Sequence, residues 1–152
     1  FIARWRRFSL AVPVVLVALA LHVFVPAAGA QVQSGTVTGV VQDQQNSVLP
    51  GVTVTLSGSD RTATFVTGPD GRYRFRTIRP AAYSGRTPHI HLKIRLGGRE
   101  LLTTQVYVAD DPGNPRDFLW RSLSAADRAA LTVVFAPGDD GLRASFPIVI
   151  DV

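Results

Sequence analysis

Residues 89–108 read HIHLKIRLGGRELLTTQVYV. In the first eight of these residues, polar and apolar side chains alternate without a break, which is the period of a β-strand with one buried face. Residues 101–108 form a second strand-forming run, and Gly97-Gly98 between the two runs is a plausible hairpin turn. The stretch therefore predicts two antiparallel strands of one sheet.

Similar strand patterns lie on both sides of this hairpin. Short runs rich in β-branched residues occur at 36–41, 52–56 and 62–66, a run with alternating aromatic residues follows at 73–78, and turn signals with Gly and Pro separate them. Two further strands are expected at 131–136 and 145–152, and one short helix is expected after the capping sequence at Ser124. Strand units of about ten residues are typical of an all-β fold, so we predict an antiparallel β-sandwich with one short helix.

The composition limits the function. The chain has 152 residues, of which 46% are hydrophobic and 18% are charged, and none is Cys. This length fits one or at most two small domains. A chain without Cys has no disulfide scaffold, no thiolate metal site and no cysteine nucleophile. The formal net charge is +5, but no basic run with interleaved aromatic residues occurs in the body of the chain, so binding to nucleic acid is not expected.

Residues 1–30 have the three parts of a secretory signal peptide. Arg4, Arg6 and Arg7 precede an almost wholly apolar run at 10–25, and AGA at 28–30 is a small-residue cleavage site. The alternative is an uncleaved membrane anchor, because the apolar run approaches the length that spans a bilayer. We favour a signal peptide at 1–30 and a domain at 31–152 that is secreted or periplasmic and has no stable membrane span after cleavage.

The stretch YSGRTPHIH at 83–91 carries the candidate site. His89 and His91 are the only His residues beyond residue 30. Strand alternation places both imidazoles on one face, about 7 Å apart at the backbone, so that they can converge on one metal ion. By itself, such a pair is more often two ordinary surface or core residues. The presence of Tyr83 and Arg86 just upstream, in a loop restricted by Pro88, favours a metal site.

The residue types indicate which metal fits. Imidazole offers a borderline nitrogen donor, and tyrosinate offers a hard, anionic oxygen that stabilises ferric iron against reduction. Zinc would need three or four nitrogen or oxygen ligands here, and only two His residues are present. We therefore expect non-haem Fe(III) rather than zinc.

Two longer motifs extend the interpretation. DGRYRFRTIRP at 70–80, followed by Tyr83 and by GRTPHIH at 85–91, resembles the C-terminal catalytic half of the intradiol ring-cleavage dioxygenases, the catechol and protocatechuate dioxygenases. LLTTQVY at 101–107 and DPGNP at 111–115 continue the similarity, which covers about residues 67–152. In that family, two Tyr and two His residues hold a ferric ion in a β-sandwich. The resemblance implies that the metal ligands are Tyr83, His89 and His91.

The resemblance also implies the chemistry. Arg86 matches a catalytic Arg that stabilises charge on the substrate during cleavage, and Gln105 matches a catalytic-site residue beside the iron. Tyr73 matches a strand position that is structural. The implied activity is cleavage of a small catechol-type aromatic diol with O2 to a muconate-type diacid, as part of aromatic compound catabolism.

The front of the domain departs from that pattern. The dioxygenases carry a further Tyr ligand after the strand that corresponds to 52–56, but the loop at 57–61 contains no Tyr. The front part of the domain, residues 31–76, instead resembles a carboxypeptidase-regulatory-like β-domain, and the resemblance covers about residues 35–76. Because iron with one phenolate fewer is more easily reduced, we expect impaired turnover. The alternative function is a non-catalytic secreted β-sandwich binding module.

Overall fold

A computed structural model describes residues 34–58, 61–83 and 85–152. The signal peptide predicted at residues 1–30 lies outside these ranges. No helix within the described ranges is long and apolar enough to cross a membrane.

The described residues form short strands and three short helical segments. In chain order these are β1 (Ser34–Asp43), β2 (Thr53–Ser57), β3 (Thr62–Val66), β4 (Arg72–Ile78), β5 (His89–Leu96), β6 (Arg99–Val108), the 3-10 turn η1 (Asn114–Arg116), α2 (Phe118–Ser122), α3 (Ala125–Leu131), β7 (Thr132–Val133), β8 (Ala136–Gly138), β9 (Gly141–Ser145) and β10 (Ile148–Ile150).

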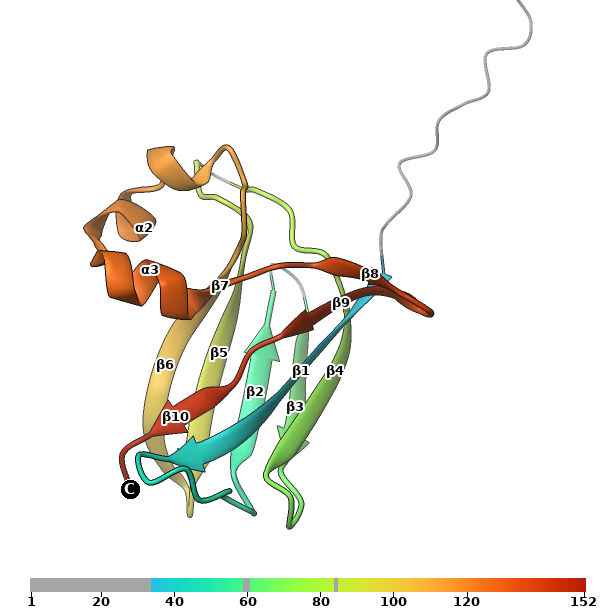
Figure 1. Ribbon diagram of the computed structural model, residues 1–152, viewed down its shortest axis with the longest axis vertical. Coiled ribbons are helices and arrows are strands. Elements are labelled where there is room, and N and C mark those ends of the chain that lie inside the picture. The colour runs from blue at the N-terminus through green and yellow to red at the C-terminus, as the bar shows by residue number, and fades with distance from the viewer. Residues whose placement is uncertain (1–33, 59–60, 84) are drawn as a thin grey trace, which may run out of the picture. The chain divides into compact units, whose positions relative to one another are not determined.

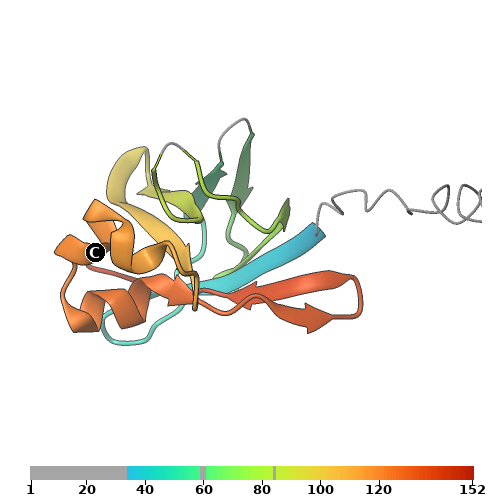
Figure 2. The ribbon, with the colours of Figure 1, turned by 90° about the horizontal axis from the view of Figure 1, so that it is seen from above.

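The strands build two facing sheets (Figure 1). In the first sheet, β1 pairs with β4 on one side and with β9 and β10 on the other, and β8 pairs with β9. The second sheet has the order β3-β2-β5-β6-β7. Most pairs are antiparallel, whereas β1 runs parallel to β9 and β10, and β6 runs parallel to β7. Figure 2, which views the molecule from above, separates the two layers. The predicted all-β sandwich is confirmed.

Alternating apolar residues from both sheets form the core. On β5, the even-numbered Ile90, Leu92 and Ile94 are at most 4% exposed, while the odd-numbered side chains point to the other face. Tyr73 on β4 is buried in the same core, and its hydroxyl donates a hydrogen bond to the carbonyl of Phe146. Tyr73 is therefore a structural residue, as the sequence suggested.

The predicted hairpin is confirmed. His89 pairs with Tyr107 and His91 with Gln105 across the antiparallel strands β5 and β6. Gly97 and Gly98 have φ values of 57° and 80°, and two successive positive φ values are what a tight turn between twisted strands requires.

The C-terminal third differs from the prediction in three places. The strand expected at 131–136 is wrong over most of its length, because α3 continues through Leu131 and β7 contains only two residues. The run AADRAAL is rich in Ala and Leu, which favour helix, so the capped helix extends to that point. The strand expected at 145–152 is shortened to β10 at Ile148–Ile150; β9, which was not expected, ends at Ser145, and Pro147, which has no backbone N–H, lies between the two strands. Helix α2 was not predicted.

Candidate metal centre

The two imidazoles lie on the outward face of β5. The Nε2 atoms of His89 and His91 are 3.2 Å apart, and the rings meet edge to face with centroids separated by 4.9 Å. His89 is 3% exposed, while the apolar Ile90 between the two His residues points into the core. Strand alternation therefore brings the two residues together as predicted.

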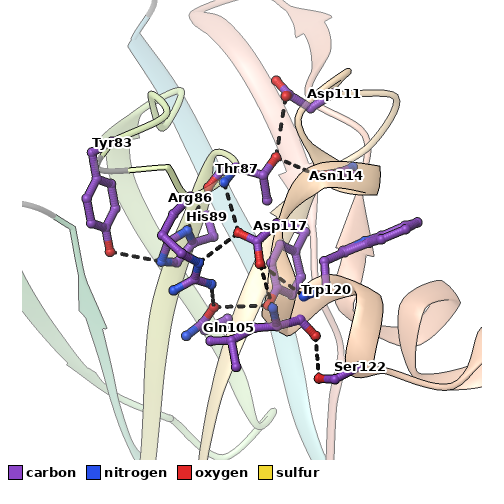
Figure 3. A network of polar contacts seen from close by, with 12 residues as sticks. Tyr83, Arg86, Thr87, His89, Gln105, Asp111, Asn114, Asp117, Trp120 and Ser122 are labelled. Carbon is purple, nitrogen blue, oxygen red and sulfur yellow. Dashed lines mark hydrogen bonds and ion pairs between the residues drawn. The ribbon is translucent and has the colours of Figure 1, made fainter.

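Tyr83 approaches the same point from the preceding loop. The backbone N–H of Arg86 donates to the carbonyl of Tyr83 at 2.7 Å, and Gly85 within this turn has a φ of 74°. That φ lies in the left-handed region, where glycine is favoured because it has no Cβ. The turn directs the Tyr83 side chain toward β5, so that its Oη lies 3.0 Å from Nε2 of His89 (Figure 3).

The hydrogen bonding of His89 fixes its tautomer. Nδ1 lies 2.7 Å from the carbonyl oxygen of Thr87. A carbonyl only accepts hydrogen bonds, so Nδ1 carries the proton and Nε2 presents a lone pair to Tyr83 and His91. A backbone carbonyl that holds one ring nitrogen in this way is the usual support for a metal-ligating imidazole.

Two separations between the candidate donor atoms match the spacing of ligands on one metal ion. Metal–nitrogen and metal–oxygen bonds in such sites are about 2.0–2.2 Å long, so neighbouring donors on one ion lie about 3 Å apart. The separations of 3.0 Å from Tyr83 Oη to His89 Nε2 and 3.2 Å from His89 Nε2 to His91 Nε2 match this spacing. Burial first, and then the positive charge of Arg86, lower the pKa of His91, which favours the neutral imidazole.

A metal site at this point would depend on the phenol of Tyr83 as a third ligand. Among the residues that the structure describes, no three His, Cys, Asp or Glu side chains are grouped so that they could hold a metal. Tyr73 and Tyr107 make their hydroxyl hydrogen bonds elsewhere, to Phe146 and Gln105. Two neutral imidazoles and one phenolate are a nitrogen and oxygen set that suits ferric iron.

A guanidinium stands beside these donors. The Nε of Arg86 donates to Oδ2 of Asp117 at 2.7 Å, and its Nη2 donates to Oε1 of Gln105 at 2.7 Å. Figure 3 shows Arg86 between these two acceptors. The Tyr107 hydroxyl also donates to Gln105 Oε1, at 3.0 Å. The structure thus brings Arg86 and Gln105, both singled out from the sequence, into direct contact.

Asp117 is the residue of this cluster that sequence reasoning missed. Its side chain is fully buried, and it is the N-cap of α2. Burial by itself raises the pKa of Asp117, but hydrogen bonds from the Trp120 N–H, the Arg86 side chain and the Thr87 N–H outweigh burial and lower the pKa below its ordinary value. The available signal was an acidic residue directly before the apolar run of α2, which is a helix start.

One known protein family matches the sequence around this cluster. The model of the carboxypeptidase regulatory-like domain matches residues 36–116, which is more than half of the chain. The chain belongs to the carboxypeptidase regulatory-like domain family. This match extends well past residue 76, where the sequence interpretation ended that resemblance, and it covers the Tyr83, His89 and His91 cluster. No curated protein sequence matches the chain.

Solved structures relate this carboxypeptidase regulatory-like domain to dioxygenases. The dioxygenase domain of a dioxygenase and carbohydrate-binding protein fusion from the cellulolytic bacterium Streptomyces sp. SirexAA-E is 31% identical, with a TM-score of 0.67 over 82% of this chain and 84% of that one. An intradiol ring-cleavage dioxygenase from Tetranychus urticae is 18% identical, with a TM-score of 0.67 over 78% and 80%. Catechol 1,2-dioxygenase from Acinetobacter sp. ADP1 is 20% identical, with a TM-score of 0.66 over 83% of this chain but only 55% of the enzyme. The domain shares the fold of these enzymes.

A hollow in the domain surface adjoins the candidate centre. It has a volume of about 320 Å³, and its lining includes Tyr83, Arg86 and Arg116. This volume falls at the lower end of the range for small-molecule sites. Its lining residues thus include one Tyr and two Arg side chains beside the candidate centre.

Proposed function

We propose that the chain is an intradiol ring-cleavage dioxygenase-like protein that uses non-haem Fe(III) to cleave a catechol-type aromatic diol with O2 to a muconate-type diacid. One observation carries the proposal: Tyr83 Oη, His89 Nε2 and His91 Nε2 converge with separations of 3.0 and 3.2 Å. The 31% identity to the Streptomyces dioxygenase domain supports it.

Each residue has a distinct part in the proposed reaction. Tyr83, His89 and His91 would hold the ferric ion, which would act as a Lewis acid toward the two diol oxygens when bound. Arg86 lines the adjoining hollow and supplies a fixed positive charge where negative charge develops on the substrate. Gln105 holds one edge of the guanidinium, so Arg86 does not need to reorganise when a substrate binds.

The same geometry supports slow turnover. The chain has three Tyr residues, and Tyr83 is the one whose hydroxyl contacts an imidazole. On β2, Ser57 pairs with His91, so the loop that follows β2 starts beside the candidate centre, and that loop contains no Tyr. One phenolate makes ferric iron easier to reduce than two do.

Iron loading and product analysis test the proposal. Protein loaded with ferric iron should bind one iron per chain, absorb visible light through tyrosinate-to-iron charge transfer, and convert catechol and O2 to a muconate-type diacid, which ultraviolet absorbance detects. His91→Ala should lose iron, colour and turnover together. Lys93→Ala removes the next outward side chain of the same strand, an exposed residue paired with Glu100 at 3.2 Å, and should retain all three properties.

The family match supports a second candidate, a non-catalytic binding module. The two functions differ in one measurement. A wild-type protein that stays colourless and binds no iron after loading would favour the binding module and overturn the dioxygenase proposal. We also propose export, in which residues 1–30 are removed; N-terminal sequencing of exported protein should then begin at Gln31.

A further inference from the structure

We propose that Asp117 is a positioning residue that fixes the guanidinium of Arg86 and, through the backbone of Thr87, the imidazole of His89. The inference rests on the proposed function, because it concerns how the residues of the same site are held. Asp117 touches neither the hollow nor the candidate metal ligands directly, so any effect on the reaction passes through its neighbours.

The carboxylate of Asp117 divides its two oxygens between two tasks. Oδ1 accepts hydrogen bonds from the backbone N–H groups of Leu119 at 2.9 Å and Trp120 at 3.0 Å, which caps helix α2. Oδ2 accepts from Arg86 Nε at 2.7 Å and from the Thr87 N–H at 2.9 Å. A helix cap requires only the first oxygen. The second oxygen is committed entirely to the segment that leads into β5.

This arrangement restrains the guanidinium on three sides. Asp117 holds Nε, Gln105 holds Nη2, and the ring of Phe118 lies 5.4 Å from the guanidinium carbon. Nη1 has no acceptor among the residues that the structure describes. The two N–H groups of Nη1 therefore remain for an oxygen of a molecule in the hollow that Arg86 lines.

Thr87 extends the restraint to the imidazole. Its N–H donates to Asp117, and its carbonyl accepts from Nδ1 of His89 at 2.7 Å. Its hydroxyl donates to Oδ1 of Asn114 at 2.6 Å, and Asn114 in turn donates to the carbonyl of Val108. The buried carboxylate of Asp117 thus holds the backbone of Thr87, and the Thr87 carbonyl orients the imidazole so that Nε2 of His89 points toward Tyr83 and His91.

Burial makes this restraint stiff. The Asp117 side chain has no solvent exposure, and that of Arg86 is 14% exposed. Removing one partner of a buried, hydrogen-bonded ion pair leaves the other charge uncompensated, so the guanidinium would turn toward water. A shift of about 1 Å in a group that acts on the transition state costs about 100-fold in rate.

Asp117→Ser separates the two tasks. Serine is a good N-cap, as Ser124 is for the neighbouring α3, so the variant retains the cap but cannot reach Arg86. We expect kcat for catechol cleavage to fall about 100-fold. Ser124→Ala removes the cap of α3, away from the site, and should leave kcat unchanged. The double variant Asp117→Ser with Arg86→Ala should lose less than the product of the two single losses, because part of the effect of Asp117 passes through Arg86 and part through Thr87.

A second measurement needs neither iron nor turnover. In nitrogen-15 NMR spectra of the metal-free protein, the side-chain Nε–H signal of Arg86, assigned as the signal missing from Arg86→Ala, should exchange slowly with water. In Asp117→Ser the same signal should exchange fast or vanish, whereas Ser124→Ala should preserve it. If Asp117→Ser does not fold, Asp117→Asn keeps the side-chain volume and one cap acceptor, and the same loss is expected.

The outcomes of the two measurements are distinct. An inactive wild-type protein whose Arg86 signal is protected, and is lost in Asp117→Ser, would refute the dioxygenase function but support the positioning role. An active wild-type protein with full kcat in Asp117→Ser would refute the positioning role and leave the dioxygenase function standing. Additive losses in the double variant, or an Arg86 signal that exchanges equally fast in wild-type protein and Asp117→Ser, would also refute positioning.

Discussion

Replacing Tyr83 with Phe removes one atom from the candidate centre. The hydroxyl oxygen is lost, while the ring can keep its place 5.2 Å from the ring centroid of His89. Tyr83 is 41% exposed, so the hydroxyl contact with His89 contributes at the low end of the ordinary range, about 0.5 kcal/mol. In the metal-free protein, the melting temperature should therefore fall by no more than about 3 °C.

With ferric iron present, the wild-type protein and Tyr83→Phe should differ far more in melting temperature. Ferric iron supplied at about 100 times its Kd should stabilise the wild-type protein by about 2.7 kcal/mol, which corresponds to a rise of about 10 °C in melting temperature for a domain of this size. Loss of a ligand should weaken binding at least about 100-fold, the upper end of what loss of a mere supporting group costs. The same iron concentration then equals the Kd, and the stabilisation falls to about 0.4 kcal/mol.

Thermal unfolding with and without ferric iron, supplied as a weak citrate complex, measures both quantities, and visible absorption reports the tyrosinate–iron band. The matched control is Tyr107→Phe, which removes another phenol hydroxyl, bonded to Gln105, from the same neighbourhood. The control should keep the iron-dependent rise and the visible band. If Tyr83→Phe also keeps them, Tyr83 is not a ligand and the metal set must be reconsidered.

Three further outcomes follow from the fold. Gly39→Ala should destabilise the protein by about 1–3 kcal/mol, because the added Cβ would lie 2.6 Å from the Tyr73 ring. Gly58→Ala should not, because its added Cβ would meet no neighbouring atom within 4 Å. Denaturant titration measures the free energy of unfolding of both variants. Ile94→Ala should cost about 2–5 kcal/mol of unfolding free energy, because Ile94 is 0% exposed. Because folding lowers the pKa of Asp117 below its ordinary value of 3.8, ionised Asp117 should stabilise the fold fully above pH 3.8, and this stabilisation should be lost as the pH falls through the lowered pKa. The free energy of unfolding, measured as a function of pH, should therefore fall less in acid for Asp117→Ser than for the wild-type protein.

The sequence is most informative where structure depends on neighbouring residues. Alternation over 89–96 predicted β5, its partner strand and the shared face of His89 and His91, because a strand has a strict period of two. The Gly97-Gly98 turn was equally readable, since it needs two residues that tolerate positive φ.

The contacts that support the candidate site could not be predicted from the sequence. Asp117 and Arg86 are 31 positions apart, and no local pattern indicates that a helix cap will also meet a guanidinium. Helix α2 has five residues, too few for a periodic signal, and its start depends on the same carboxylate. The strand expected at 131–136 rested on the strand propensity of TVVF at 132–135, but within that run only residues 132 and 133 pair with a strand, β6, while Ala136 begins the separate strand β8.

Strand β5 carries core residues on one face and the candidate metal ligands on the other. Ile90, Leu92 and Ile94 hold the sandwich together, while His89 and His91 face away from it. Because the core contacts come from the inward set, a substitution at the half-buried His91 can abolish metal binding while the sandwich still folds. A high yield of well-behaved, soluble material is consequently no evidence of enzymatic competence, and each variant has to be tested for metal content in its own right.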